Sequence, residues 1–220
     1  EGGFPYAVGY GLTECAPLLA GFNPGNPKLQ STGPVCKEVQ IKIERSDAGT
    51  GEGEIWVKGP NIMKGYYKEP EMTREIMNPD GWLKTGDLGV LDENGYLYIK
   101  GRVKSVIVRS NGENVYPEDI ESVINNFRYV LESLVVEKKG RLVAYVHFNR
   151  DEIEQRYLYL KTEMANYVEQ KIEEYRRELI IYVNARVNKF SQLQLVVSQP
   201  DPFQKTATQK IKRFLYTEVS

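Results

Sequence analysis

Short polar segments punctuated by glycine carry the residues that could do chemistry. In the first of them, Tyr10 lies between two glycines and is followed by Thr13 and Glu14. A neighbouring glycine lets the backbone approach a ligand closely, and the tyrosine ring can lie flat against a planar group. The threonine hydroxyl and the glutamate carboxylate suit phosphate oxygens and a hard cation such as magnesium. Tyr10, Thr13 and Glu14 are therefore candidate ligand-binding residues.

Three further segments have the same character. Asp87 follows a glycine in segment 81–87, so its carboxylate could accept hydrogen bonds from a sugar diol. Segment 101–117 combines basic residues with glycine, and segment 203–213 is rich in lysine and threonine. Taken singly, each has a simpler explanation, because glycine turns with an aspartate are commonly only turns. A basic run is commonly a solvated face or a weak nucleic-acid patch.

The elements that must position these segments change in character along the chain. Eighteen of the 19 glycines lie at or before Gly112, and the first half predicts short strands such as 39–44 and 53–59. A hairpin is expected over 90–99, with the positive φ of a type I′ turn at Asn94 and Gly95.

From Pro117 onward the pattern changes to helices and longer strands. We expect a helix over 117–124, with proline in its first turn, and then strands 131–136 and 141–148. Apolar residues at helical spacing follow over 151–190, where we expect a break near 162–165 because longer helices are unusual in compact domains. Packing of this stretch against the neighbouring sheet is favoured over a coiled coil or a partner-binding helix.

Composition excludes several classes of protein. The 220 residues carry a net charge of -1, 41% are hydrophobic and 27% are charged, which is typical of a globular chain. The mean hydropathy of -0.47 and the absence of a long apolar run argue against a transmembrane helix. No secretion signal is visible, and the chain begins at Glu1 without methionine, which suggests a piece of something longer. Two cysteines are too few for a disulfide framework or a four-ligand zinc site, and we expect reduced thiols and a cytoplasmic location.

The single histidine narrows the chemistry further. His147 lies in a predicted strand, and the chain has no second histidine for a metal pair. No candidate nucleophile lies near it in the sequence, so a His-based catalytic triad is disfavoured. We interpret His147 as a structural residue of the strand.

The order of the glycine-punctuated segments carries more information than any one of them. The chain presents, in sequence, the segments Tyr10–Glu14, Gly53–Pro60, Gly65–Tyr67, Gly81–Leu88, Gly101–Lys104, Gly112–Pro117 and Lys205–Arg213. This series resembles the adenylate-forming superfamily, which comprises acyl-CoA synthetases, non-ribosomal peptide adenylation domains and firefly-type luciferases. The resemblance covers nearly the whole chain, from about residue 6 to residue 214. Residues 202–216 are most similar to AMP-forming long-chain fatty acid–CoA ligases.

The resemblance implies a reaction in two steps. A carboxylate attacks the α-phosphate of ATP to give acyl-AMP and pyrophosphate, and the thiol of CoA then displaces AMP to give a thioester. The expected co-substrates are therefore ATP and CoA, with Mg²⁺ as the metal. The expected partners are small molecules, chiefly a medium- or long-chain fatty acid, and not nucleic acid. A peripheral membrane contact of the parent enzyme is plausible.

The resemblance also implies roles for individual residues. Lys210 would stabilise the charge that develops between the carboxylate and the α-phosphate. The other roles are adenine stacking for Tyr10, nucleotide binding at Gly11, the α-phosphate for Thr13, magnesium for Glu14, the ribose hydroxyls for Asp87 and Arg102, the hinge for Lys104, and the CoA channel loop for Gly112.

The fold implied by the resemblance is of the α+β class. Residues 1–101 would form the end of the large adenylation domain, mostly antiparallel and shaped as a distorted β-barrel. Residues 102–220 would form a small, mobile α+β lid domain whose rotation presents Lys210 and Gly112 in turn.

Two departures from the family pattern matter. Gln209 stands where family members usually have glycine before the adenylation lysine, and a side chain there could alter the loop. The family's phosphate loop and most of its acyl pocket lie upstream of the adenine motif, and nothing in this chain supplies them. We therefore expect these 220 residues alone to bind nucleotide weakly and to turn nothing over.

Three alternatives stay open at this point. The first is a ligase for an aromatic or other non-fatty acid, and the second is a non-catalytic, nucleotide-binding descendant of the fold. The intact set of Glu14, Asp87, Arg102 and Lys210 argues against the second. A nucleic-acid-binding domain that uses residues 205–213 is disfavoured by the near-neutral net charge.

Overall fold

The computed structural model describes residues 7–22, 28–45, 51–157 and 164–217. It divides into two compact units, Glu1–Lys104 and Ser105–Ser220, each described here by itself. The sequence placed the domain boundary between residues 101 and 102. In the structure, Arg102 still belongs to β7, a strand of the first unit.

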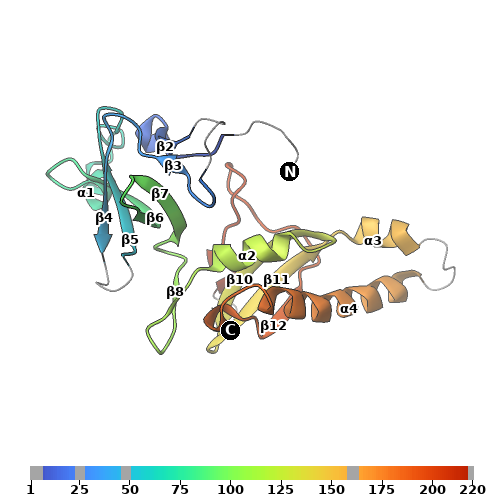
Figure 1. The fold of residues 1–220 in the computed structure, drawn as a ribbon. Helices are drawn as coiled ribbons and strands as arrows, with labels where there is room; N and C mark the ends of the chain where they lie inside the picture. The colour runs from blue at the N-terminus through green and yellow to red at the C-terminus, as the bar shows by residue number, and fades with distance from the viewer. Residues whose placement is uncertain (1–6, 23–27, 46–50, 158–163, 218–220) are drawn as a thin grey trace. The chain divides into compact units, whose positions relative to one another are not determined.

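The first unit is built on a five-stranded antiparallel sheet in the order β3-β7-β6-β5-β4 (Figure 1). A separate antiparallel pair, β1 and β2, precedes it in the chain. The elements are β1 (Gly9–Gly11), η1 (Thr13–Cys15), β2 (Leu18–Gly21), β3 (Gly33–Pro34), β4 (Gln40–Arg45), β5 (Gly53–Lys58), α1 (Pro70–Ile76), β6 (Leu83–Leu91) and β7 (Tyr96–Arg102).

This sheet is open, where the sequence suggested a distorted barrel. Its edge strands β3 and β4 pair with β7 and β5 and not with each other, so no closed barrel forms among the described residues. β3 has only two residues, which is too short to carry a ladder around a barrel. The expected α+β class and antiparallel pairing are confirmed.

Alternation of side chains along the strands explains how the first unit buries its core. Every second residue of β5 is buried, as period-2 patterning requires, and β6 continues the same alternation. The fully buried side chains form one cluster, which consists of Cys15, Leu19, Ala20, Ile55, Val57, Leu83 and Leu97.

The hairpin between β6 and β7 differs from the prediction in its turn. Only Gly95 has a positive φ, of 76°, so the turn is not of type I′. The Asp92 carboxylate accepts hydrogen bonds from the backbone N–H groups of Asn94 and Tyr96, each at 2.9 Å. These side-chain bonds stabilise a longer loop in which Asn94 needs no left-handed conformation.

The second unit contains a three-stranded sheet and the longer helices. Its elements are β8 (Ile107–Val108), β9 (Asn114–Val115), α2 (Pro117–Asn125), β10 (Val130–Lys138), β11 (Arg141–Phe148), α3 (Arg150–Tyr157), α4 (Met164–Asn184), η2 (Lys189–Ser191), β12 (Leu195–Ser198) and α5 (Phe214–Thr217). The sheet order is β10-β11-β12, with β10 antiparallel to β11 and β12 parallel to it.

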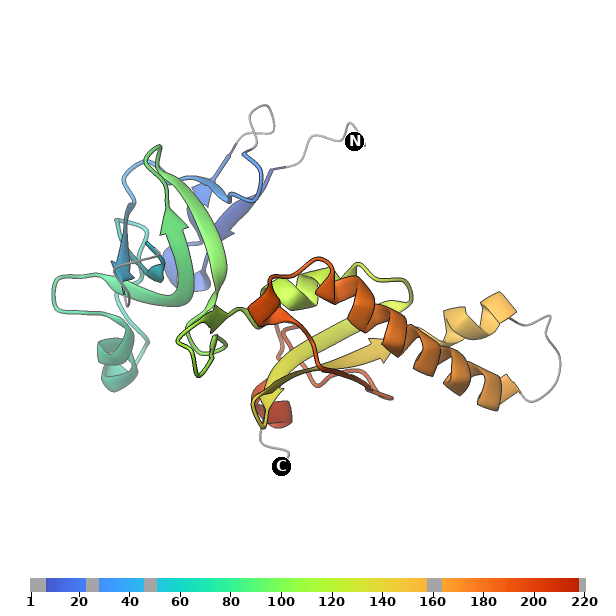
Figure 2. The same ribbon diagram turned by 60° about the horizontal axis from the view of Figure 1, so that its bottom comes forward.

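Both faces of this sheet are covered. Alternate residues of β11, such as Ala144 and Val146, pack with α2 and α4 in the larger core, and Figures 1 and 2 show these helices over one face. The intervening Val143 packs instead with Leu134, Val136 and Phe203, so the C-terminal segment covers the other face. His147 lies in β11 and its Nδ1 is 2.9 Å from the carbonyl oxygen of Gln199, which agrees with the structural role expected for it.

The apolar stretch at 151–190 forms two helices, α3 and α4, that pack against the sheet core. Ile153, Ile172 and Leu179 are buried there, as the favoured interpretation predicted. Residues 162 and 163, at the expected break, lie outside the described part of the chain. Over the part that is described, no helix combines the length and the apolar character needed to cross a bilayer.

Candidate functional site

Three of the residues that the sequence singled out meet at one carboxylate in the first unit. Asp87 on β6 stands opposite Arg102 on β7 in the antiparallel ladder, and Arg102 Nε lies 3.3 Å from Asp87 Oδ1. The Tyr10 hydroxyl donates a hydrogen bond to Asp87 Oδ2 at 2.7 Å. Only 9% of Asp87 is exposed. The aspartate is therefore held by a phenol on one oxygen and a guanidinium on the other.

The residues just before Asp87 fix its position. Its backbone N–H donates to Thr85 Oγ1 at 3.1 Å, and the Thr85 hydroxyl donates to the carbonyl oxygen of Ile55 at 2.8 Å. Gly86 has a φ of 73°, and a Cβ there would lie 3.3 Å from Arg102 Nη2. Glycine at this position therefore permits both the left-handed backbone and the close guanidinium.

The electrostatics of Tyr10 follow from this arrangement. Burial, and then the negative charge of Asp87, raise the pKa of the Tyr10 phenol well above its ordinary value. The phenol stays protonated at physiological pH and acts as a hydrogen-bond donor. The sequence predicted Tyr10 and Asp87 as separate ligand contacts and did not predict the bond between them. Nothing local in the sequence signals a contact between residues 77 positions apart.

Glu14 and Thr13 lie together on the short helix η1. The Tyr66 hydroxyl donates to Glu14 Oε1 at 2.9 Å, and the backbone carbonyl of Glu14 accepts from the N–H of Met63 at 2.8 Å. Hydrogen bonding to Glu14 and its charge contribute to a raised pKa of Tyr66. Tyr66, from the Gly65–Tyr67 motif, thus orients the carboxylate of Glu14, the candidate magnesium ligand, a role that the motif did not predict.

The surroundings of Glu14 fit magnesium better than a metal caged by protein ligands. Among the described residues, no group of three His, Cys, Asp or Glu side chains could hold a metal ion. Mg²⁺ commonly binds through one or two carboxylates together with phosphate oxygens and waters. A single oriented carboxylate beside a threonine hydroxyl is such a donor set.

Gly11 has a structural reason to be glycine. A Cβ there would lie 1.9 Å from the carbonyl oxygen of Pro17, because β1 and β2 approach closely after Tyr10. The hairpin that presents Tyr10 therefore depends on Gly11. The nucleotide contact that the sequence predicted at Gly11 stays a prediction.

Lys210 lies in the second unit, on a short hairpin. Its side chain is exposed, and its carbonyl oxygen accepts from the N–H of Thr206 at 2.8 Å. Gln209, just before it, has a φ of 62°. The side chain that replaces the usual glycine thus occupies the left-handed conformation that glycine would adopt freely.

The two remaining candidates lie in turns. Lys104 is exposed and follows β7 as the last residue of the first unit. Gly112, with a φ of 83°, lies in the turn between β8 and β9, where its N–H donates to the carbonyl oxygen of Arg109 at 2.8 Å. Arg109 Nη1 also contacts Glu137 Oε1 at 2.7 Å and the carbonyl oxygen of Gly140 at 2.9 Å. A hollow of about 670 Å³ borders this turn, lined by Val108, Arg109, Ser110, Asn111, Glu137, Gly140, Lys189 and Phe190.

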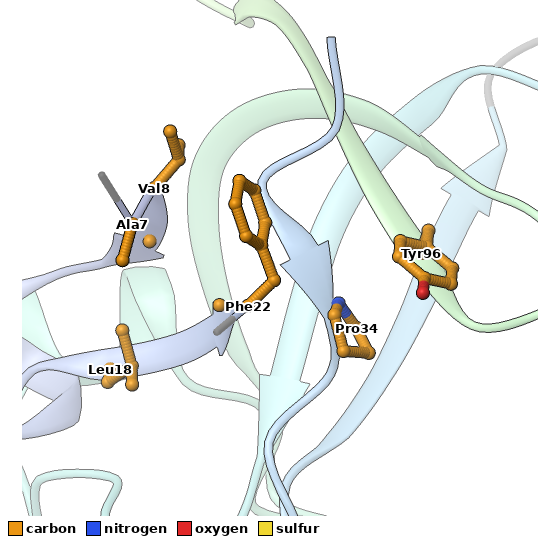
Figure 3. Close-up of a pocket in the computed structure, with 8 residues that line it drawn as sticks. Ala7, Val8, Leu18, Phe22, Pro34 and Tyr96 are labelled. Carbon is orange, nitrogen blue, oxygen red and sulfur yellow. The ribbon is translucent and has the colours of Figure 1, made fainter. Parts of the chain in front are cut away.

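A second hollow, of about 540 Å³, lies beside the β1–β2 pair in the first unit (Figure 3). Its lining is mostly apolar and contains none of the predicted site residues: Ala7, Val8, Gly9, Leu18, Gly21, Phe22, Pro34 and Tyr96. This hollow was not predicted from the sequence. The exposure of Leu18, at 47%, is a property of the fold that no local pattern reveals.

Comparisons with known proteins identify the family of this chain. A family described as AMP-binding enzyme matches residues 2–67. A long-chain-fatty-acid–CoA ligase of Yersinia pestis is 38% identical over 184 residues, which are 78% of this chain and 32% of the relative. A 2-succinylbenzoate–CoA ligase of Bacillus subtilis is 43% identical over 139 residues, which are 60% of this chain and 28% of the relative. The chain thus spans about a third of the length of these relatives.

Solved structures give the same result for the fold. The O-succinylbenzoate coenzyme A synthetase of Bacillus subtilis, in complex with ATP and magnesium ion, matches with a TM-score of 0.77 and 32% identity. That match covers 96% of this chain and 41% of the other. ATP-bound MatB from Rhodopseudomonas palustris matches with a TM-score of 0.72 and 26% identity, over 98% of this chain and 41% of the other.

Proposed function

We propose that this chain, which belongs to the AMP-binding enzymes of the adenylate-forming superfamily, is the C-terminal part of an ATP-dependent acid–CoA ligase. In the proposed reaction, a carboxylate oxygen attacks the α-phosphorus of ATP and pyrophosphate leaves. The sulfur of CoA then attacks the acyl carbon, and AMP leaves. The observation that carries the proposal is the convergence of Tyr10, Asp87 and Arg102.

Asp87 and Arg102 would bind the ribose of the nucleotide. Among the residues that the structure describes, each carboxylate oxygen of Asp87 has one side-chain partner, and an ionised carboxylate offers about four acceptor sites in total. Lone pairs thus remain for the two hydroxyls of a diol. Arg102 forms an ion pair with the carboxylate and can itself donate to a ribose oxygen. Tyr10, anchored through its hydroxyl, would offer its ring to the adenine.

Thr13 and Glu14 would act at the phosphates. The Thr13 hydroxyl is exposed on η1 and would donate to an α-phosphate oxygen. Glu14, oriented by Tyr66, would hold Mg²⁺ together with phosphate oxygens. When bound there, the ion would neutralise phosphate charge as the acid approaches.

Lys210 would supply the positive charge for the first step. Its exposed ammonium is a compact point charge on a flexible stem, suited to the charge that develops between the carboxylate and the α-phosphate. Lys104, in the turn at the end of the first unit, would be the hinge that lets the second unit move. Gly112 would lie on the loop that lines the CoA channel for the second step.

For the acid, we propose a medium- or long-chain fatty acid. The sequence of residues 202–216 and the similarity to the Yersinia pestis relative support this choice. The Bacillus subtilis 2-succinylbenzoate–CoA ligase supports the alternative, an aromatic acid. A non-catalytic descendant is the less favoured alternative, because it would have no use for both the paired Asp87 and the exposed Lys210. We also propose a cytoplasmic location, with peripheral membrane contact of the parent enzyme through its acyl substrate.

The test is acid-dependent exchange of pyrophosphate into ATP by the intact protein in which this chain occurs. The panel runs from acetate to palmitate and includes aromatic acids such as 2-succinylbenzoate. Exchange that peaks with long acids and is lost in Lys210→Ala supports a fatty acid ligase. Exchange only with aromatic acids selects the alternative. No exchange with any acid overturns the proposed activity and leaves the non-catalytic reading.

A further inference from the structure

The hairpin that carries Lys210 is too short to hold its own shape. Within residues 204–212, the N–H of Lys212 donates to the carbonyl oxygen of Gln204 at 2.8 Å, and Thr206 donates to Lys210 at 2.8 Å. Lys205 and Ile211 form a single bridge between these two bonds. An isolated two-stranded ribbon is at best marginally stable in water. Contacts from outside must therefore hold this one.

The first strand of the hairpin is fixed to β10 through Glu132. The Lys205 ammonium forms an ion pair with Glu132 Oε1. The backbone N–H of Phe203 donates to Glu132 Oε2 at 3.4 Å. The side chains of Lys205 and Glu132 are 30% and 20% exposed, so solvent screens this pair only in part. The Glu132 carboxylate thus holds the chain at Phe203, just before the hairpin, and at Lys205, in its first strand.

The second strand is fixed by Arg213 to α2 and β10. Arg213 Nη2 forms an ion pair with Glu121 Oε2, and Nη1 donates to the carbonyl oxygen of Val135 at 3.4 Å. Glu118 Oε1 lies 3.5 Å from Arg213 Nη2 as well. Glu121 is 11% exposed, and its Oε1 accepts from the N–H of Val135 at 2.7 Å. Arg213 and Glu121 therefore both bond to Val135, on its two backbone groups.

Apolar packing supports the base of the hairpin between these two ion pairs. Phe203, only 3% exposed, packs with Leu134 and Val136 of β10. Its ring contacts Tyr216 edge to face, with the centroids 5.2 Å apart. The Tyr216 hydroxyl accepts from the N–H of Gln204 at 3.1 Å. The base of the hairpin is thus packed against the sheet, while the tip, with Lys210, is exposed.

The basic residues of this segment divide into two kinds. Lys205 and Arg213 are engaged with carboxylates of the sheet and of α2. Lys210 and Lys212 have no carboxylate within ion-pair distance among the residues that the structure describes. The ion-paired residues Lys205 and Arg213 thus lie on either side of Lys210 in the sequence.

We propose that Lys205 and Arg213 are positioning residues for Lys210, and that their ion pairs with Glu132 and Glu121 set the place from which its ammonium acts. This inference rests on the proposed role of Lys210 in adenylation. A lysine side chain is flexible, so its base must be fixed if the charge is to arrive at a defined point. Misplacement of a catalytic group by about 1 Å can cost about a hundredfold in rate.

The first experiment separates the two half-reactions in the intact protein. Lys205→Glu and Glu132→Lys each place like charges together, and the double variant restores the pair with its polarity reversed. We expect each single variant to lower the maximal rate of adenylation about 10- to 100-fold, with the KM for ATP nearly unchanged. The double variant recovers most of that loss. Thioester formation from supplied acyl-adenylate and CoA stays within about twofold of wild type, since Lys210 has no part in that step.

Lys212→Gln is the matched control, because it removes a cation from the same hairpin without breaking either ion pair. Its adenylation rate is expected to stay within about twofold of wild type. Arg213→Gln tests the second ion pair and is expected to act like the single variants at Lys205. Equal rates for wild type, Lys205→Glu and Arg213→Gln would overturn the proposal, as would loss of both half-reactions to the same extent.

The second experiment needs no catalysis and uses the 220-residue chain. Hydrogen exchange followed by mass spectrometry reports on the amides of Thr206 and Lys212. We expect at least about tenfold faster exchange there in Lys205→Glu and in Arg213→Gln, with β11 unchanged and the double variant restored. Unchanged protection would overturn the proposal even if the protein has no ligase activity. Failure of the proposed function gives a different result. The wild-type protein then shows no exchange of pyrophosphate into ATP, while the amides of the hairpin stay protected from hydrogen exchange.

Discussion

Asp87 and Lys210 are the charged centres of the two units, and the fold holds them in different ways. Asp87 lies in a nine-residue strand, is nearly buried, and bonds directly to Tyr10 and Arg102. Lys210 is exposed on a hairpin, and the ion pairs that hold the hairpin are made by its neighbours. In the first unit the functional contacts are also structural contacts. In the second unit the two are made by different residues, so function and stability should respond separately to mutation.

The largest expected effect comes from Lys210→Ala. Loss of a charge that acts mainly in the transition state is expected to lower pyrophosphate exchange by about 100- to 1,000-fold. Stability should be unaffected, because the side chain is exposed and unpaired among the described residues. Exchange assays and urea unfolding of the same samples test both parts. A loss of stability comparable to that of a core variant would contradict the separation of function from structure in this unit.

The second prediction concerns pH and the ion pair at Arg213. Burial raises the pKa of Glu121 to about 7, against the lowering effect of Arg213. A raised folded-state pKa means that the folded state binds the proton more tightly than the unfolded state. The contribution of Glu121 to the unfolding free energy is therefore fully present below about pH 4.5 and is lost as the pH rises to about 7. The difference in unfolding free energy between wild type and Glu121→Gln should change by up to about 3 kcal/mol across this window.

Far-UV circular dichroism suits this measurement, since the helices α2, α3 and α4 all lie in the second unit. Urea unfolding at several pH values between about 4.5 and 8 gives the slope for both proteins. A pH dependence that is the same in wild type and Glu121→Gln would show that Glu121 does not titrate in this range.

Asp87→Asn should affect function and stability together, unlike Lys210→Ala. The amide cannot match the charge of Arg102, and the partly buried bonds to Tyr10 and Arg102 weaken. We expect a stability loss of about 1–3 kcal/mol for the first unit and a similar loss in nucleotide binding. Both tryptophans, Trp56 and Trp82, lie in the first unit, so tryptophan fluorescence reports its unfolding specifically. Weaker nucleotide binding at full stability would show that the Asp87 contacts do not support the sheet.

The smallest effect is expected at Gln209. Its left-handed backbone, with a φ of 62°, costs a non-glycine residue about 1 kcal/mol. Gln209→Gly relieves that strain but loosens the unfolded chain, so the net stability change should lie within about 1 kcal/mol. Adenylation should change less than about threefold, because the ion pairs at Lys205 and Arg213 remain. Gln209→Ala, which keeps the strain, is the control, and a large gain in activity with glycine would show that strain limits Lys210.

The sequence predicted those parts of the fold that depend on local patterns. Strand 141–148 was predicted with the bounds that β11 has, because alternating apolar residues and the turn at Lys139 and Gly140 are both local signals. The helix from Pro117 was predicted for the same reason, since proline and acids fill its first turn. The turn at Asp92 was not, because a side chain that bonds to two backbone groups overrides the preference of Asn–Gly.

The candidate site was predictable in its residues but not in its contacts. Motif order identified Tyr10, Asp87 and Arg102, while their bonds join residues far apart in the chain. The pair of Glu121 and Arg213 spans 92 positions, and no local pattern could suggest it. Arg213 lies within a recognised motif, yet the motif does not indicate which carboxylate this arginine contacts. Such contacts follow from sheet register and helix packing, which only the folded chain defines.

The parallel pairing of β12 with β11 has a consequence for biosynthesis. A parallel partner cannot arrive through a tight turn, so the ribosome must make residues 149–194 before the third strand exists. Val196 belongs to the same buried cluster as Ala144 and Leu179, and a nascent chain that ends earlier leaves that cluster partly uncovered. The hairpin with Lys210 follows only after this strand. The nascent chain therefore completes the three-stranded sheet before the hairpin that carries Lys210 is made. A chain released before residue 195 would lack both β12 and this hairpin.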